Sequence, residues 1–235
     1  MGKLLWTPSE ERVKSTNMYR FMNYVNERFG KDFKSYPELY QWSVDNIPDF
    51  WATWWDFADI KFSKKYDQVV DDPFKLPGAK WFPGAKLNFA ENLLRYRDDQ
   101  VALIFKGEDH PTTKMTYAEL YREVAKVARA LKAAGVKAGD RVAGFMPNMP
   151  QTVVAMLAAT SMGAIWSSCS PDFGIKGVMD RFSQIQPKVL FAANGYWFKG
   201  KNLGSLDRIA EIVQQLDTIE KVVITPYTQQ DFDIS

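Results

Sequence analysis

The chain contains 235 residues, of which 46% are hydrophobic and 25% are charged, and its 30 basic and 28 acidic side chains leave a formal net charge of +2. This composition is that of an ordinary globular protein and excludes a disordered or fibrous chain. A net charge close to zero offers no general attraction to nucleic acid or to acidic membranes, so neither is an expected partner. The single cysteine, Cys169, excludes an internal disulfide framework, and the lone His110 excludes a histidine-rich metal site.

The sequence also indicates the cellular compartment in which the protein is expected. Residues 1–6 hold too short an apolar run for a signal peptide. The longest weakly polar stretch, from Val153 to Trp166, falls short of the roughly 18 residues that a membrane span needs. We therefore expect a soluble protein, and a reducing, cytoplasmic compartment is the default for a chain with one cysteine.

Residues 1–97 are rich in aromatic side chains and include six of the eight tryptophans. Apolar residues at helical spacing predict one amphipathic helix over 10–29, a second over 36–44 and, after the interruption at Pro48, a third over 50–57. Proline and glycine punctuate residues 71–86, which predicts an irregular surface segment. The tryptophans of the third helix, Trp51, Trp54 and Trp55, are interpreted as core packing rather than as a stacking platform. We expect residues 1–97 to form a helical, aromatic-rich N-terminal extension.

Residues 98–235 alternate between strand and helix patterns. Asn88 is a plausible N-cap for a short helix just before this region, and Thr116 with Glu119 forms a capping box. The expected strands cover 101–105, 141–146, 164–166, 188–193 and 221–225, and the expected helices cover 116–131, 150–162, 174–185 and 205–216. Strands that are apolar on both faces and alternate with helices predict an α/β fold with a parallel sheet covered by helices.

Residues 195–202 nearly match a phosphate-binding P-loop. Gly195 to Lys201 fits the pattern of glycine, four residues, glycine and lysine, but Asn202 stands where the loop needs a Ser or Thr hydroxyl for magnesium. Three bulky aromatics fill a loop whose backbone should wrap tightly around phosphate, and the strand 222–225 ends without an aspartate. We favour an ordinary loop or a basic ligand-contact loop over a P-loop.

Residues 167–173 follow a predicted strand at the edge where α/β folds place their ligands. Cys169 has no base near it in sequence and is interpreted as a small buried hydrophobe rather than as a nucleophile. The hydroxyls and carboxylate of this loop could contact a polar ligand at the start of the next helix. Spacing alone favours the simpler interpretation, in which Ser170 or Asp172 caps that helix.

Several motifs, in order along the chain, resemble those of the adenylate-forming acyl-CoA synthetases. They lie at residues 81–92 (WFPGAKLNFAEN), 115–120 (MTYAEL), 135–142 (GVKAGDRV), 146–150 (MPNMP), 155–159 (AMLAA) and 162–174 (MGAIWSSCSPDFG). Trp166 with residues 167–173 fits the acetoacetyl-specific branch of the family better than its acetyl branch. The resemblance covers nearly the whole chain, and it identifies residues 98–235 as the first, incomplete part of the AMP-binding α/β domain.

The resemblance implies a two-step ligase reaction. ATP and a carboxylic acid, here acetoacetate, form an acyl-adenylate with release of pyrophosphate, and the thiol of CoA then displaces AMP to give the thioester. Magnesium neutralises phosphate charge in the first step. Acetate or another short acid is the alternative substrate, because the residues themselves do not define an acyl pocket.

The family's phosphate loop, adenine motif, ribose-binding aspartate and catalytic lysine are absent from the sequence. The resemblance implies that they lie downstream of Ser235, so that the chain is the front part of a longer enzyme whose remainder is its partner. No catalytic residue is carried over, and the isolated chain is expected to be inactive.

By position, the resemblance places contacts to CoA on two segments, and the residues concerned are Ser170, Pro171, Asp172, Phe173, Lys199 and Lys201. The two lysines could attract the phosphates of CoA as flexible point charges. Two hypotheses of other classes stay open at this point. One is a nucleotide hydrolase built on residues 195–201, and the other is a non-catalytic α/β binding domain.

Overall fold

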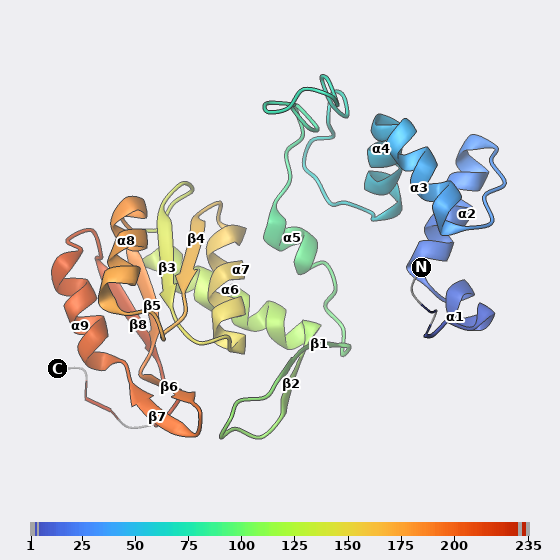
Figure 1. Ribbon diagram of the computed structural model, residues 1–235. Helices are drawn as coiled ribbons and strands as arrows, with labels where there is room; N and C mark the ends of the chain where they lie inside the picture. The colour runs from blue at the N-terminus through green and yellow to red at the C-terminus, as the bar shows by residue number, and fades with distance from the viewer. Residues whose placement is uncertain (1–2, 4, 230–231, 234–235) are drawn as a thin grey trace. The chain divides into compact units, whose positions relative to one another are not determined.

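A computed structural model describes residues 3, 5–229 and 232–233 of the chain. The chain divides into two compact units, Met1–Leu87 and Asn88–Ser235 (Figure 1). Within the described ranges, none of the helices combines the length and apolarity that crossing a bilayer requires.

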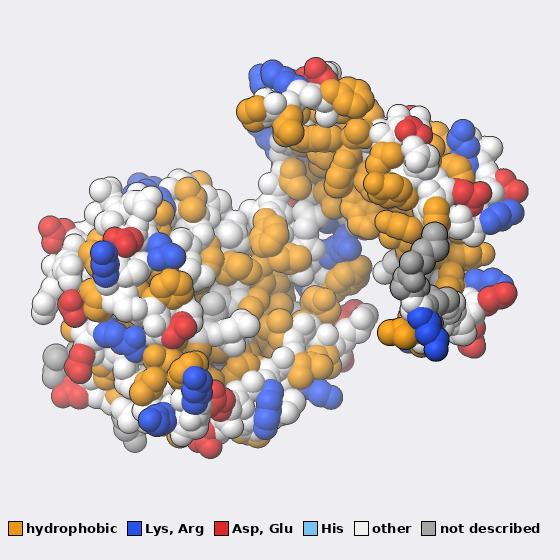
Figure 2. Space-filling view, in the orientation of Figure 1, with side chains coloured by type: hydrophobic (Ala, Val, Ile, Leu, Met, Phe, Trp, Pro, Cys, Tyr) orange, Lys and Arg blue, Asp and Glu red, His pale blue; other side chains and the backbone are white. Residues whose placement is uncertain are grey.

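The described residues of the first unit form the helices α1 (Glu10–Lys14), α2 (Asn17–Phe29), α3 (Tyr36–Asp45) and α4 (Ile47–Phe57). The ring of Phe21 is buried and lies 5.1–5.8 Å from three aromatic rings of α4. Trp55 is only 6% exposed, whereas Trp51 and Trp54 are each 39% exposed. All three pack against other aromatic rings of the unit. Figure 2 shows hydrophobic side chains gathered over this unit.

The expected helix over 10–29 is two helices in the structure. The hydroxyl of Ser15 donates to the carbonyl oxygen of Arg12, and that of Thr16 donates to the carbonyl oxygen of Val13. Thr16 also accepts a hydrogen bond from the backbone N–H of Tyr19, which makes it the N-cap of α2. Two consecutive hydroxyl residues thus end one helix and start the next, a break that apolar periodicity alone does not reveal.

The second unit contains a four-stranded sheet with the order β4-β3-β5-β8. Its strands are β3 (Arg141–Phe145), β4 (Ile165–Cys169), β5 (Val189–Ala193) and β8 (Lys221–Thr225), and every neighbouring pair is parallel. Chain order reverses beside β3, because β4 pairs on one side of it and β5 on the other. The predicted α/β fold with a parallel sheet is confirmed.

Helices cover both faces of this sheet (Figure 1). One face packs against α6 (Tyr117–Ala133) and α7 (Pro150–Ser161), and the other packs against α8 (Ile175–Ile185) and α9 (Leu206–Gln215). Val142 faces the first pair of helices, while Ala143 and Phe145 face the second. This alternation makes both faces apolar, as the sequence pattern predicted.

Two helix starts were correctly predicted from capping residues. The side chain of Asn88 accepts from Glu91 N and caps α5 (Phe89–Leu93). Thr116 accepts from Glu119 N, and the Glu119 carboxylate accepts from Thr116 N at 2.8 Å, which completes the capping box of α6. The hydrogen bond from the Thr116 N–H holds the pKa of the Glu119 carboxyl below its ordinary value.

Two antiparallel hairpins were not predicted. In the first, β1 (Val101–Phe105) pairs with β2 (Thr113–Thr116), so the strand expected over 101–105 exists but lies outside the parallel sheet. In the second, β6 (Gly195–Phe198) pairs with β7 (Lys201–Gly204). The strands β2 and β7 are four residues long and mostly polar, so neither carries an apolar alternation that would identify it.

Candidate functional site

Three segments lie at the carboxyl edge of the parallel sheet. Residues 170–174 follow β4, the β6–β7 hairpin follows β5, and residues 226–229 follow β8. Because the strands are parallel, these segments emerge at the same edge, where open α/β sheets bind their ligands. The two sequence segments expected to contact CoA therefore lie at the edge that this fold uses for binding.

The loop after β4 is a tight turn in which Phe173 N donates to the carbonyl oxygen of Ser170 at 3.2 Å. Pro171 is buried, whereas Ser170, Asp172 and Phe173 are exposed. The interpretation of Ser170 or Asp172 as a helix cap is wrong, because Gly174 occupies the N-cap position of α8 and no side chain caps it. The polar side chains of this loop are thus left facing solvent.

The aromatic ring of this loop is held by the first turns of α8. The guanidinium carbon of Arg181 lies 4.5 Å from the centroid of the Phe173 ring. A Cβ atom at Gly177 would lie 3.1 Å from the same ring, so the missing side chain lets Phe173 approach the helix. Contacts of this kind fix a partly exposed ring in one position.

The near match to a P-loop, residues 195–202, covers β6, the turn and the start of β7. Lys199 and Gly200 connect the strands and have φ angles of +53° and +73°. The Glu108 carboxylate accepts from the N–H groups of both residues, at 3.1 and 2.7 Å. This segment is a hairpin followed by α9, so it does not wrap around phosphate as a P-loop does. The side chains of Lys199 and Lys201 are exposed on it.

Asn194 anchors the base of the hairpin and was not recognised from the sequence. Its side chain is 3% exposed, accepts from Tyr227 N and Thr228 N at 2.8 and 3.2 Å, and donates to the carbonyl oxygen of Gln229 at 2.9 Å. One asparagine thus satisfies three backbone groups of the segment after β8.

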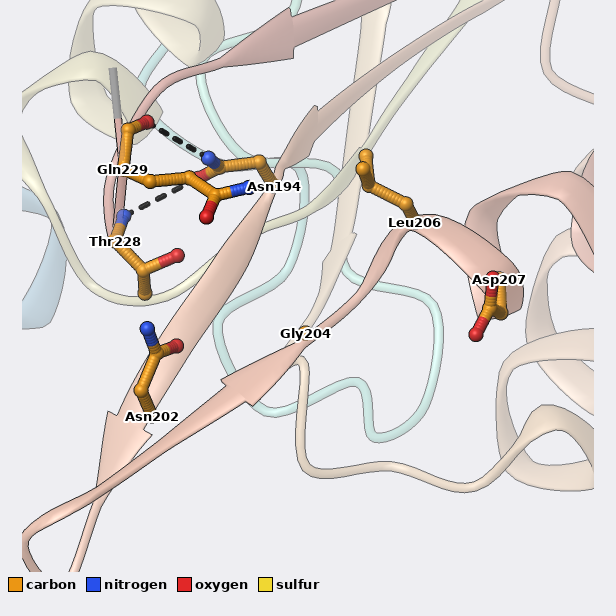
Figure 3. A pocket seen from close by; sticks show the side chains of 7 residues that line it. All are labelled: Asn194, Asn202, Gly204, Leu206, Asp207, Thr228 and Gln229. Atoms are coloured by element: carbon orange, nitrogen blue, oxygen red, sulfur yellow. Dashed lines mark hydrogen bonds between the residues drawn. The ribbon is translucent and has the colours of Figure 1, made fainter. Parts of the chain in front are cut away.

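A cavity of about 510 Å³ lies beside this anchor (Figure 3). Its lining is mostly polar and consists of Asn194, Asn202, Gly204, Leu206, Asp207, Thr228 and Gln229. The hairpin, the first turn of α9 and the segment after β8 all contribute to it, so it belongs to the same edge of the sheet.

Arg208 on α9 joins the two segments expected to contact CoA. Its Nη1 donates to the carbonyl oxygen of Pro171 at 2.6 Å, and its guanidinium lies 5.5 Å from the centroid of the Tyr196 ring in β6. No direct hydrogen bond between the loop 170–173 and Lys199 or Lys201 occurs in the described ranges, so the two segments meet through Arg208 at the base of the hairpin rather than at its tip.

Cys169 and His110 do not form a nucleophile–base pair. The His110 Nε2 lies 3.0 Å from the carbonyl oxygen of Tyr227, and its ring stacks on that of Tyr227 at 4.5 Å. Cys169 is 4% exposed at the end of β4 and packs among apolar side chains. The interpretation of Cys169 as a small buried hydrophobe is confirmed.

We expect Cys169 to react slowly with alkylating reagents in the native chain. Burial raises the pKa of its thiol, and the positive charge of Arg181 lowers it by a smaller amount, so little reactive thiolate is present at neutral pH. Iodoacetamide labelling followed by mass spectrometry measures the rate, and the same chain in guanidinium chloride is the control. Equal rates in the two conditions would contradict the buried placement. Because the chain has one cysteine, the label reports on one position.

Comparison with known proteins gives matches along the entire chain. Residues 89–233 match the model of the AMP-binding enzyme family, and residues 36–93 match the acetyl-coenzyme A synthetase N-terminus. The chain is 46% identical over its full length to an acetoacetyl-CoA synthetase of Xenopus tropicalis, and 43% identical over 95% of its length to an acetoacetyl-coenzyme A synthetase of Rhizobium meliloti. It spans only 35% and 34% of these two relatives.

A solved structure gives the same result. The acetoacetyl-CoA synthetase of Streptomyces lividans superposes with a TM-score of 0.92 and 40% identity, and the match covers 99% of this chain and 36% of that one. The resemblance to the acyl-CoA synthetases inferred from short motifs is therefore confirmed. Since the AMP-binding model matches more than half of the chain, the protein belongs to the AMP-binding enzyme family.

Proposed function

We propose that the chain forms about a third of an AMP-forming acetoacetate–CoA ligase. The observation that carries the proposal is the superposition on the Streptomyces lividans acetoacetyl-CoA synthetase, in which 99% of the chain matches at 40% identity. The superposition of the two backbones alone would support only a shared fold. Similarity at this level over the entire length, including the aromatic-rich first unit, supports a shared activity as well.

In the proposed reaction, a carboxylate oxygen of acetoacetate attacks the α-phosphorus of ATP, and pyrophosphate leaves. The thiolate of CoA then attacks the acyl carbonyl carbon, and AMP leaves with the electron pair of the broken bond. Groups of three or more His, Cys, Asp or Glu residues that could hold a metal ion do not occur in the described part of the chain. We place the contribution of this chain in the second step, because the residues expected to contact CoA lie at the carboxyl edge of the sheet, where open α/β sheets bind their ligands.

The contribution of this chain is the binding of CoA at the carboxyl edge of the sheet. Ser170 and Asp172 offer exposed polar groups, Phe173 offers an exposed ring and Pro171 shapes the turn. Lys199 and Lys201 offer positive charge on an ordered hairpin. Cations on a fixed backbone suit the phosphates of CoA, and an aromatic ring suits its adenine base. The cytoplasm, expected from the single cysteine, is the proposed location.

The activity is tested by acid-dependent exchange of pyrophosphate into ATP, using the complete gene product. Acetoacetate, acetate, propionate and butyrate are compared at equal concentration. Exchange that prefers acetoacetate supports the proposal, and preference for another acid keeps the two-step mechanism while overturning the substrate. A folded, complete protein that shows no exchange with any acid contradicts the ligase function.

The CoA contacts are tested by removing the two positive charges. Lys201→Ala and Lys199→Asn are expected to raise the KM for CoA by about tenfold each, the loss of one charge-assisted contact. Asparagine is chosen at residue 199 because it tolerates a left-handed backbone, which the φ of +53° requires. Lys132→Ala is the matched control, because this lysine lies in the last turn of α6, the helix that leads into the amino end of β3. With dephospho-CoA, which lacks the 3′-phosphate, the same lysine variants should raise the KM by less than they do with CoA. A KM that no lysine variant changes contradicts these contacts.

A further inference from the structure

Arg208 contacts both segments of the proposed CoA site through its guanidinium group. We propose that Arg208 is a positioning residue that holds the loop 170–173 and the β6–β7 hairpin in one fixed arrangement, so that both can contact CoA together. This inference rests on the proposed function and adds to it a residue that does not itself touch the substrate.

The contacts of Arg208 come from four places in the second unit. Nη1 donates to the carbonyl oxygen of Pro171 at 2.6 Å, and Nη2 donates to that of Gly204, the last residue of β7, at 3.4 Å. The guanidinium also lies 5.5 Å from the ring of Tyr196 and 5.6 Å from that of Phe145, the last residue of β3. One side chain thus joins the loop after β4, the ends of the hairpin strands next to the sheet, and the end of β3.

These contacts use the planar shape of the guanidinium as well as its charge. Of the ion pairs present in the described ranges, none includes Arg208, and its partners are carbonyl oxygens and aromatic rings. A planar fork can donate to a carbonyl in its plane and stack on a ring with its face, whereas a lysine ammonium can do neither in the same way. The side chain is half-buried; its hydrogen bond to Pro171 is partly buried, whereas the one to Gly204 is exposed.

The far end of the hairpin has a second anchor, which holds only the turn. Glu108 binds the N–H groups of Lys199 and Gly200 at the turn, while Arg208 fixes the end next to the sheet. A short two-stranded hairpin is marginally stable alone, so its orientation depends on such anchors. The lysine side chains are left exposed between the two anchors. Loss of Arg208 should therefore move the cations relative to the loop 170–173 without removing either.

The test compares Arg208→Met and Arg208→Lys in the complete ligase. Both are expected to raise the KM for CoA by about 10- to 100-fold, as for the loss of hydrogen bonds from a charged group, and to affect acid-dependent pyrophosphate exchange much less. Arg129→Met, on the exposed face of α6, is the matched control and should leave the KM unchanged. Failure of Arg208→Lys to rescue separates a positioning role from direct attraction of phosphate by charge.

A double-mutant cycle with Lys201→Ala supplies a second readout. If Arg208 acts by placing the hairpin, the two changes affect the same contact and their effects on the KM are smaller together than their sum. Tyr196→Leu, which removes a ring under the guanidinium and leaves Arg208 in place, should raise the KM in the same direction and serves if Arg208→Met does not fold.

The inference is overturned if Arg208→Lys keeps the wild-type KM for CoA, if the effects of Arg208→Met and Lys201→Ala on that KM are additive, or if Tyr196→Leu leaves that KM unchanged. Absence of exchange in the wild-type enzyme contradicts the proposed function instead, so the two failures are distinguishable.

Discussion

Replacing Phe182 with Ala is expected to lower the free energy of unfolding of the second unit by about 3–5 kcal/mol, the cost of leaving a phenylalanine-sized cavity in a packed core. Phe182 is 0% exposed and lies on α8 in the cluster between the sheet and the helices α8 and α9. Both helices pack against that cluster, so the cavity left by Phe182→Ala cannot close unless one of the helices moves. Against a typical total of about 5–15 kcal/mol, this loss is large.

The measurement has to report on the second unit alone, because a chain with two compact units need not unfold in one step. Pulsed alkylation of Cys169 across a guanidinium series does so, since the only cysteine of the chain lies in the same cluster as Phe182. In Phe182→Ala, the midpoint of the unfolding transition should shift strongly to a lower guanidinium concentration. Phe89→Ala on α5, where the ring is 57% exposed, is the matched control and should shift it little. Equal shifts for both variants would contradict the assignment of Phe182 to the core.

Elements of the second unit could be predicted wherever a local signal was strong. The capping box at Thr116 and the cap at Asn88 mark helix starts because each side chain bonds a backbone group three residues away. The strands β3, β5 and β8 were recognisable as short apolar runs. The break between α1 and α2 and the four-residue strands β2 and β7 were missed, because hydroxyl side chains and short polar strands leave no periodic pattern.

The candidate site divides in the same way. The loop predicted over 167–173 follows a recognisable strand, which places it at the carboxyl edge of the sheet. The strand, β4, extends to Cys169, so only residues 170–173 of that prediction lie in the loop. Arg208 could not be found, because its partner Pro171 lies 37 residues away in the chain and a carbonyl acceptor has no sequence signature. Glu108 is separated from Lys199 by 91 residues, and its role as the anchor of the hairpin turn depends on the fold alone. What fixes the site is thus less visible in the sequence than what lines it.

Replacing Asn194 with Ala is expected to lower the free energy of unfolding of the second unit by about 2–4 kcal/mol, because three partly buried hydrogen bonds to the backbone are lost. Two of these groups are the N–H groups of Tyr227 and Thr228, and the third is the carbonyl oxygen of Gln229. The segment after β8 should then separate from the base of the hairpin. Asn202→Ala, an exposed asparagine beside the same cavity, is the matched control.

Hydrogen exchange distinguishes this loss of anchoring from general destabilisation. In Asn194→Ala the amides of Tyr227 and Thr228 should exchange faster under native conditions, while the amides inside β3 keep their protection until the unit unfolds. A variant that exchanges these two amides at the wild-type rate would contradict the role of Asn194 and favour the stacking of Tyr227 on His110, at 4.5 Å, as the contact that holds the segment. Faster exchange confined to residues 227 and 228 would instead identify Asn194 as the link that joins the end of β8 to the hairpin. One side chain between two strand ends would then set the wall of the cavity, because both the hairpin and the segment after β8 line it.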